Sequence, residues 1–384
     1  MGKDKERKNG NIAPLSKWET AKYSSSLVRR GLELEKLIED KHKRKLFLIE
    51  KGDKYGYIDS TGKIVINPQF DYAGKFSEGL ARIQVEDKWG YIDITGKVVI
   101  DIEFDEASEF SEGLACISTA DENGYLDKSG YIDKTGKMVI KPQFDFAYRF
   151  SEGLARVTID KKGGYINKIG EIIINAQFDG DSDFSEGLAC VFIGGKLGHI
   201  DDRFGFIDGK YGYIDNKGKM VIKPQFNGAS SFSEELASVM IDDRWGYINK
   251  IGEIVINLQF DWAGDFSEGL ASINIGGKRD NPFPTLPGGF LRGGEWGYID
   301  NKGRIVIKPK FDYAGNFSEG LAHIKVGDKW GHINRIGEIT IKPQFDFAGV
   351  FSDGLAYVEE YTGEGEKNTG YIDRTGEYIW KSSW

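Results

Sequence analysis

The chain has 384 residues, a formal net charge of -9, and far more glycine (51 residues) than proline (9 residues). The acidic charge disfavours nucleic acid as a partner, because sequence-independent affinity for phosphates requires a basic surface. The charged N-terminal residues and the absence of an apolar run long enough for a membrane span predict a cytoplasmic protein.

Two segments precede the repetitive part of the chain. Residues 1–15 are polar and show no apolar periodicity, which predicts a disordered arm. In residues 16–45, Trp18, Leu27 and Leu34 belong to an apolar set that recurs at roughly helical spacing among charged residues. We therefore expect an amphipathic α-helix over 16–45 that caps the repeats.

A motif of six residues, Phe-Ser-Glu-Gly-Leu-Ala, marks a repeat whose usual period is 34 residues. Eight copies occur, two of them with one substitution, at 76–81, 110–115, 150–155, 184–189, 232–237, 266–271, 317–322 and 351–356. A second motif, an aromatic residue followed by Gly-Tyr-Ile-Asp, occurs at 55–59, 89–93, 211–215 and 296–300, with variants in the other repeats. Such a period indicates one supersecondary unit that stacks on its neighbours.

Each repeat is predicted to be a three-stranded antiparallel meander. Residues 80–85 alternate between core-facing and outward-facing side chains, 89–93 run back after a turn, and 98–100 follow a second turn at Gly96. Nine meanders begin at Leu46, Leu80, Leu114, Leu154, Leu188, Leu236, Leu270, Leu321 and Leu355. The predicted fold is all-β, and we favour an open superhelical array over a closed propeller-like ring, because the first and last meanders are each whole.

The repeats also carry Trp-Gly pairs, at 89–90, 245–246, 296–297 and 330–331. With the two motifs, these pairs make residues 46–380 resemble the bacterial WG-repeat family. The resemblance implies a repeat scaffold of largely undefined function, which we place at 46–384 as eight repeats and a final partial one. Where Tyr55, Gly163 and Tyr211 replace the Trp, no functional residue is lost, so we interpret the Trp as mainly a packing residue.

Every second repeat carries an insertion in the same hairpin. The distance from the last Ala of the first motif to the Gly of the second is 9, 15, 9, 23, 9, 26, 9 and 14 residues in chain order. The following turn alternates too, and Ile169, Ile251 and Ile336 in one class of turn predict a partly covered surface there. Insertions on one side of a repeat protein commonly form its binding surface, so the four long loops are the predicted partner site.

The longest insertion contains an apolar set that the meander cannot easily accommodate. Its candidate partner-binding residues are Phe283, Leu286, Phe290, Leu291 and Arg292, because exposed apolar clusters mark interaction sites. The alternative is a loop that folds back on its own array. The second-longest insertion imitates the Gly-Tyr-Ile-Asp strand twice, at 198–201 and 205–208, which predicts an extra hairpin.

One strand position varies from repeat to repeat, two residues after the Leu that begins each meander. Its occupants are Arg82, Cys116, Arg156, Cys190, Ser238, Ser272, His323 and Tyr357. By alternation, it lies opposite the Ala and Ile side chains of the core face. Two interpretations are open: a ligand-reading surface, with Arg82, Arg156, His323 and Tyr357 as candidates, or an indifferent solvated face, which antiparallel sheets often have.

No catalytic site, metal site or cofactor is predicted. The four histidines show no triad or metal-ligand spacing, and Cys116 and Cys190 are too few for a disulfide framework, so free thiols are expected. Residues 179–183 have alternate carboxylates but lack the bidentate Glu of a calcium loop. The repeated Ser-Glu pairs, such as Ser77 and Glu78, are expected to have a structural role in a turn.

The sequence therefore predicts a non-catalytic scaffold that binds a protein or peptide partner through its insertions. The alternative is a carbohydrate-binding array, because Trp89, Trp245, Trp296 and Trp330 recur on strands and aromatic faces stack on sugars. Burial of these Trp side chains would remove the main support for the carbohydrate alternative.

Overall fold

The computed structural model describes residues 45–120, 126–200, 203–279, 291–361, 363 and 365–382. The chain divides into two units, Met1–Lys45 and Leu46–Trp384. The predicted arm, 1–15, lies outside the described residues, and so does the predicted capping helix, 16–45, apart from Lys45. Both therefore stay predictions.

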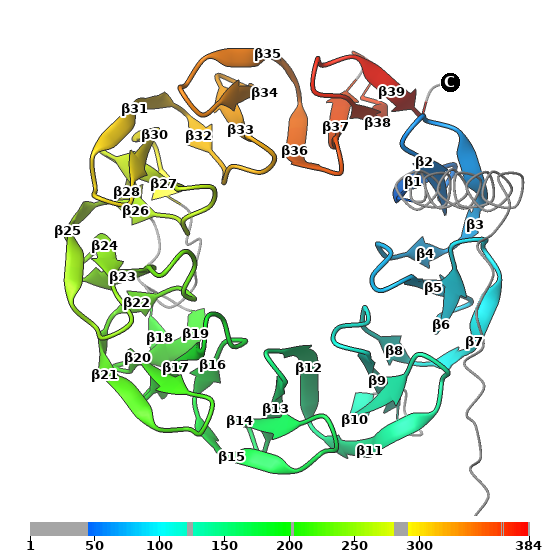
Figure 1. Ribbon diagram of the computed structural model, residues 1–384, viewed down its shortest axis with the longest axis horizontal. Helices are drawn as coiled ribbons and strands as arrows, with labels where there is room; N and C mark the ends of the chain where they lie inside the picture. Colours follow the sequence, from blue (N-terminus) through cyan, green and yellow to red (C-terminus); the bar gives the residue numbers. More distant parts are fainter. Residues whose placement is uncertain are drawn as a thin grey trace, which may run out of the picture. The chain divides into compact units, whose positions relative to one another are not determined.

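The described part of the second unit forms nine successive antiparallel sheets, which we call blades 1 to 9 (Figure 1). Blades 1 to 3 contain β1 (Leu46–Lys51), β2 (Lys54–Asp59) and β3 (Ile64–Phe70); β4 (Tyr72–Ala73), β5 (Leu80–Val85), β6 (Lys88–Asp93) and β7 (Val98–Phe104); and β8 (Glu106–Ala107), β9 (Leu114–Ala120), β10 (Leu126–Asp133) and β11 (Met138–Phe144). Blades 4 to 6 contain β12 (Phe146–Ser151), β13 (Leu154–Ile159), β14 (Lys162–Asn167) and β15 (Ile172–Phe178); β16 (Gly180–Asp181), β17 (Leu188–Ile193), β20 (Lys210–Asp215) and β21 (Met220–Phe226); and β22 (Gly228–Ala229), β23 (Ala237–Ile241), β24 (Arg244–Ile248) and β25 (Ile254–Phe260).

Blades 7 to 9 contain β26 (Trp262–Ala263), β27 (Leu270–Ile275), β30 (Glu295–Asp300) and β31 (Ile305–Phe311); β32 (Tyr313–Ala314), β33 (Leu321–Val326), β34 (Lys329–Asn334) and β35 (Ile339–Phe345); and β36 (Phe347–Ser352), β37 (Leu355–Tyr361), β38 (Lys367–Ile372) and β39 (Tyr378–Lys381). Two small hairpins project from blades 5 and 7, formed by β18 (Lys196–Ile200) with β19 (Arg203–Ile207) and by β28 (Lys278–Arg279) with β29 (Leu291–Arg292). The longer outer strands run along the outside of the ring and the inner strands lie toward its centre (Figure 1).

The prediction of three strands per repeat is right but incomplete, because eight of the nine blades contain a fourth, inner strand. In blade 2 this strand is β4, where Tyr72 pairs with Gln84 and Ala73 with Ile83. The segment that we expected only to cross between meanders thus joins the next sheet. Consequently the predicted partial repeat at the end is a full four-stranded blade, whereas blade 1 shows three strands within the described residues.

The blades close into a ring, so the open array that the sequence favoured is wrong and the propeller-like alternative is right (Figure 1). Blades 1 and 9 meet where the Tyr371 hydroxyl donates a 2.9 Å hydrogen bond to the Leu48 carbonyl oxygen. Phe47 packs edge-on against the Tyr371 ring, and Trp380 of blade 9 is buried against Ile49 of blade 1. Whole first and last meanders are compatible with closure because side-chain packing joins the described ends.

The glycine of the second motif is required by the outer strand. The register between β2 and β3 passes from Tyr55↔Phe70 to Tyr57↔Ile66, so two residues of β2 oppose four of β3. The outer strand bulges over the glycine between them, and a Cβ on Gly56 would lie 2.5 Å from the Ile66 carbonyl oxygen. Only glycine leaves room for this bulge, which explains why it stands in every blade.

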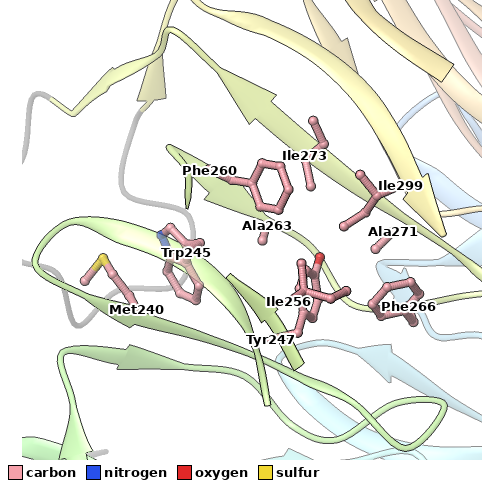
Figure 2. Packing of buried hydrophobic residues seen from close by; sticks show 10 residues of the cluster. All are labelled: Met240, Trp245, Tyr247, Ile256, Phe260, Ala263, Phe266, Ala271, Ile273 and Ile299. Atoms are coloured by element: carbon pink, nitrogen blue, oxygen red, sulfur yellow. The ribbon is translucent and has the colours of Figure 1, made fainter. Parts of the chain in front are cut away.

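Each blade packs on the next through an apolar cluster. Between blades 6 and 7, Tyr247 and Phe260 lie with Phe266 and Ile273 of the following blade (Figure 2). The buried Tyr247 hydroxyl donates a 2.7 Å hydrogen bond to the Gly264 carbonyl oxygen, which avoids the penalty of an unpaired buried hydroxyl. The same bond to the next blade is made by Tyr57, Tyr91, Tyr131, Tyr165, Tyr213 and Tyr298, and by Nε2 of His332.

The Ser-Glu pair of the first motif links neighbouring blades. Ser77 Oγ donates to the Phe110 carbonyl oxygen at 2.6 Å, and the Glu78 carboxylate accepts from the Gly113 amide at 3.1 Å. Glu78 has a φ of 53°, a left-handed conformation that is uncommon for a residue other than glycine. The Ser bond recurs at Ser111, Ser151, Ser185, Ser233, Ser267 and Ser318. This geometry agrees with the structural role expected from the sequence.

The turn between the two last strands of a blade alternates between two hydrogen-bonded classes from blade 3 to blade 8. In one class, Asp59 Oδ1 accepts hydrogen bonds from the Thr61 and Lys63 amides, and the turn ends on a lysine. In the other class, Asn167 Nδ2 donates to Glu171 Oε2 at 2.7 Å. In blades 4, 6 and 8 an Asn thus donates to the Glu of the same turn, whereas in blade 9 Asp373 stands with Glu377 and accepts from its amide.

The branched residues in the second class of turn are exposed. Ile169, Ile251 and Ile336 are 70%, 71% and 71% accessible, so the prediction of a covered surface at these turns is wrong. The backbone amide of Ile169 donates to the Asn167 side chain while its own side chain faces solvent. The alternation of the turns thus reflects different hydrogen bonds within the turn.

Candidate functional site

The four long insertions lie in equivalent hairpins, between the second and third strands of blades 3, 5, 7 and 9. Equivalent hairpins of blades in a closed ring open toward the same face, which we call the insertion face. In blade 5 the insertion forms the predicted extra hairpin, with His199 opposite Phe204 in the β18–β19 pair. In blade 7 the base of the insertion is the β28–β29 pair.

The structure describes two of the five candidate residues of the longest insertion, Leu291 and Arg292. Phe283, Leu286 and Phe290 lie outside the described residues. Leu291 is half-buried in β29 and packs against the apolar cluster between blades 7 and 8. Arg292, next to it, is exposed. Leu291 is therefore the predicted residue that joins the insertion to the body of the ring.

The variable strand position faces the next blade, so the interpretation as a solvated sheet face is wrong. Cys116, Cys190, Ser238 and Ser272 are 7%, 5%, 2% and 3% exposed. Both faces of a blade are covered in a ring, because each blade packs between two others. The residue at this position therefore decides the chemistry of each interface between blades.

In blade 2 this position is filled by Arg82. Its Nη1 donates a 2.7 Å hydrogen bond to the Ala107 carbonyl oxygen on the inner strand of blade 3. The guanidinium carbon lies 4.7 Å from the centre of the Trp89 ring and 5.6 Å from that of Tyr72. The chain thus binds its own guanidinium group between an aromatic surface and a carbonyl oxygen.

Arg156 occupies the equivalent place in blade 4 and adds an ion pair. Its Nη1 donates to the Asp181 carbonyl oxygen at 2.9 Å, and its Nε donates to Asp183 Oδ1 at 2.8 Å. The guanidinium carbon lies 3.9 Å from the centre of the Tyr148 ring. Burial raises the pKa of the Asp181 carboxyl to about 6, although the charge of Arg156 acts in the opposite direction.

His323 and Tyr357 fill the position in blades 8 and 9 with rings. His323 stacks between Tyr313 and Trp330, with ring centres 5.8 Å and 5.5 Å away. Burial, with a smaller contribution from His332, lowers the pKa of His323 to about 4, so the imidazole is neutral at pH 7. The Tyr357 hydroxyl donates a 2.8 Å hydrogen bond to Glu359. The structure places the four candidates in different interfaces, so they do not form one site.

Where serine takes this position, in blades 6 and 7, a cavity of about 580 Å³ opens between the inner strands of blades 6, 7 and 8. Its lining is aromatic and polar, with Ser230, Ser238, Trp245, Trp262, Asp265, Ser272, Leu291, Trp296, Tyr313, Asn316 and His323 among its residues. Ligand pockets usually have volumes of roughly 300 to 1,000 Å³, so this cavity can hold a small group. We call it the serine cavity and regard it as the candidate binding site.

Aromatic pairs form the walls of the serine cavity. The ring centres of Trp245 and Trp262 are 5.1 Å apart, and those of Trp296 and Tyr313 are 5.0 Å apart. Trp245 and Trp296 are buried to 4% and 9% exposure, which agrees with the packing role expected for the Trp of the motif. Tyr313, at 37% exposure, leaves ring surface for a ligand.

Asp265 gives the serine cavity its charge. Burial raises the pKa of its carboxyl, and a hydrogen bond from Ser230 opposes this effect. Asp312 also lines the cavity, and its Oδ2 accepts a 2.7 Å hydrogen bond from the Gly327 amide. None of the described residues that line the cavity is Lys or Arg, so the site is electronegative.

The carboxylates of 179–183 and the two cysteines lie outside the serine cavity. Within the described residues, no group of three or more His, Cys, Asp or Glu side chains could hold a metal ion. Asp179 pairs with Lys162, while Asp181 and Asp183 both face Arg156, so the carboxylates of 179–183 have cationic side chains of the protein as partners. Cys116 and Cys190 are free and buried, and burial raises the pKa of both thiols. No described helix is long and apolar enough to cross a membrane.

The residues of the serine cavity that sequence reasoning missed include Trp262, Asp265 and Tyr313. They lie on or directly after the inner strands, in segments that we had interpreted as crossings. A signal was present, because the residue before the Phe of the first motif varies in charge from repeat to repeat, as Lys75, Ser231 and Asp265 show.

A ring of nine blades with apolar clusters between them and a cavity at its inner strands is a β-propeller. The model of the WG containing repeat matches the chain eight times, at 55–89, 89–121, 130–162, 164–196, 211–245, 245–278, 296–330 and 330–361. The chain therefore belongs to the family of WG containing repeat proteins, as its motifs had indicated.

Solved structures are similar in fold and distant in sequence. A crystal structure of the eukaryotic initiation factor is similar with a TM-score of 0.59 and 12% identity, over 88% of this chain and 95% of that one. The β-propeller domain of the Trilobed protease from Pyrococcus furiosus is similar at 9% identity, with a TM-score of 0.36, over 87% of this chain and 97% of that one. At 12% identity the likeness to the first of these structures concerns the fold alone. No curated protein matches the chain.

Proposed function

We propose that the protein is a non-catalytic binding scaffold of the cytoplasm, whose insertion face and serine cavity receive a protein or peptide partner. The observation that carries the proposal is the meeting of two features at one place. The longest insertion brings Leu291 into the lining of the serine cavity. A ligand in the cavity would therefore contact both the rigid ring and a segment of the insertion face.

The geometry favours recognition of an extended surface. The insertions recur in alternate blades, so a partner that spans several blades meets several of them at once. The ring supplies rigidity, because each blade is linked to the next by the Tyr and Ser hydrogen bonds described above. A rigid scaffold that presents variable loops lowers the ordering cost of binding.

Carbohydrate binding is a second candidate function. Trp262 and Tyr313 line the serine cavity together with Asn316 and Asp265, a combination that can stack on a sugar ring and bond its hydroxyls. Against it, Trp245 and Trp296 are buried, so two of the Trp residues that suggested sugar binding have little free surface.

The test compares partner capture by the intact chain and by a chain in which 277–294 is replaced by the short turn of blade 6, Asp242 and Asp243. We expect a specific protein or peptide to bind the intact chain saturably and the shortened chain at least about tenfold more weakly, the loss of about 1.4 kcal/mol. The matched control shortens the blade 5 insertion, 194–209, in the same way.

Equal capture by the intact and shortened chains would place the binding surface elsewhere and contradict the proposal. Selective retention of a glycan in place of a protein, competed by the free sugar, would support the second candidate. Thermal unfolding of both variants checks that the ring still folds.

A further inference from the structure

Two interfaces of the ring show how it binds a guanidinium group. In blade 2, Arg82 lies over Trp89 and donates to a carbonyl oxygen of the next inner strand, that of Ala107. In blade 4, Arg156 donates to the equivalent carbonyl oxygen, that of Asp181, and also to the carboxylate of Asp183. The acceptors stand 25 and 27 residues after Arg156.

The interface between blades 6 and 7 has an aromatic ring, an inner-strand carbonyl and a carboxylate at matching positions and has no arginine. Ser238 replaces it, and Trp245 follows by the same seven residues that separate Trp89 from Arg82. Ala263 and Asp265 stand 25 and 27 residues after Ser238, as Asp181 and Asp183 stand after Arg156. Aromatic ring, carbonyl strand and carboxylate are thus all present, and all three line the serine cavity.

The charge of the site points in the same direction. Asp183 forms ion pairs with Arg156 and Arg149, whereas none of the described residues that line the serine cavity around Asp265 is Lys or Arg. The raised pKa of the Asp265 carboxyl shows that burial disfavours the ionised form more than the hydrogen bond from Ser230 stabilises it. A cation placed between Asp265 and the Trp262 ring would supply the missing compensation.

We propose that the serine cavity binds an arginine side chain of the partner, with the guanidinium group over the Trp262 ring and against Asp265. This inference rests on the proposed function and gives its partner a chemistry. Arginine is preferred to lysine because its planar guanidinium group stacks on rings and presents several donors to carbonyl and carboxylate oxygens. A neutral sugar would leave the Asp265 carboxylate without a counter-charge.

The experiment uses the full chain and three acetylated, amidated tripeptides, Gly-X-Gly, in which X is arginine, lysine or citrulline. Binding is followed by the fluorescence of the Trp residues and by the peptide's own nuclear magnetic resonance signals. We expect saturable binding of the arginine peptide, about tenfold weaker binding of the lysine peptide, and no measurable binding of uncharged citrulline.

Three variants locate the site. Ser238→Arg supplies the missing guanidinium group from the chain itself and should abolish binding of the arginine peptide. Asp265→Asn removes the counter-charge without changing shape and should weaken binding about tenfold. The matched control, Asp243→Asn, makes the same change of charge in an exposed turn of blade 6 outside the cavity and should leave the affinity unchanged.

Equal affinity for arginine and citrulline, undiminished binding to both Ser238→Arg and Asp265→Asn, or no binding of the arginine peptide by the unaltered chain overturns the inference. If a partner found through the insertion face binds Ser238→Arg as well as the unaltered chain, the scaffold proposal stands and the arginine inference fails. If the arginine peptide binds as expected but no partner depends on the insertion, the chemistry of the cavity stands and the proposed function fails.

Discussion

The interface between blades 4 and 5 and the interface between blades 6 and 7 share one frame and differ in what fills it. In the first, Arg156 forms an ion pair with Asp183 inside the protein. In the second, Ser238 leaves a cavity, and Asp265 at the matching position lines it. A ring of near-identical units thus holds a satisfied charge pair at one place and an electronegative cavity at another.

The interface between blades 4 and 5 also differs in the side chains that fill it. Gly163 takes the place of the motif Trp, and a Cβ there would collide with the side-chain oxygen of Asp181. Asp181 itself stands where Ala263 stands in blade 7. The buried carboxylate of Asp181 therefore takes the place of the missing indole ring, and Arg156 lies beside it. The comparison teaches that the Tyr, Gly and Ser-Glu positions build the ring, whereas a few positions at each interface determine its chemistry.

The largest expected effect comes from making blade 6 resemble blade 4 at the Trp position. Trp245→Gly removes a side chain that is 4% exposed and leaves a void that no carboxylate fills. We expect the free energy of unfolding to fall by about 3 to 5 kcal/mol, the usual cost of deleting a large buried ring. Denaturant unfolding measures it, and Trp245→Phe is the control with a smaller loss. A loss under 1 kcal/mol for Trp245→Gly would show that the ring is not a packing residue.

Asp181 should make stability depend on pH. Its folded pKa of about 6 lies above the ordinary 3.8, so the folded state holds this proton more tightly between those values. Stability from this group is therefore full below about pH 4 and is lost as the pH rises through 6, by up to about 3 kcal/mol. Asp181→Asn should remove that loss, so the variant gains on the unaltered chain between pH 4 and 7. An unchanging difference across this range would contradict the raised pKa.

Restoring the Trp to blade 4 tests the exchange of indole ring for carboxylate. Gly163→Trp alone should lower the free energy of unfolding by about 1 to 3 kcal/mol, because the ring meets Asp181. Together with Asp181→Ala, the loss should shrink, giving a coupling of at least about 1 kcal/mol in a double-mutant cycle. Additive effects would mean that the two positions do not share the space.

Much of the fold could be predicted because the same sequence pattern recurs from repeat to repeat. Alternation in segments such as 80–85 and a glycine turn after each second motif specify the strands and hairpins locally. Closure could not be predicted, because it depends on small angles between blades that add up over the whole ring. No single motif marks it: the closing contacts of Phe47 and Tyr371 are ordinary packing.

The candidate site was predictable only in part. The variable position led to Arg82 and Arg156, which show how the ring binds guanidinium, and to His323, which lines the serine cavity. Ser238 was noted only as one occupant of that position, because serine by itself suggests no ligand. Asp265 escaped notice since its meaning lies in its distance from Ser238, which becomes visible once Arg156 and Asp183 are seen paired.

The smallest expected effect is that of Asp265→Asn on stability. Burial raises the pKa of this carboxyl, so its ionisation destabilises the folded state as the pH rises above the ordinary range of Asp. We expect Asp265→Asn to stabilise the protein at pH 7, by less than Asp181→Asn does, because Asp265 borders an open cavity. Thermal unfolding at pH 5 and 7 checks the sign and the order. A destabilised variant would show that Asp265 is compensated within the ring, and the serine cavity would then lack the unmet charge that a guanidinium group needs.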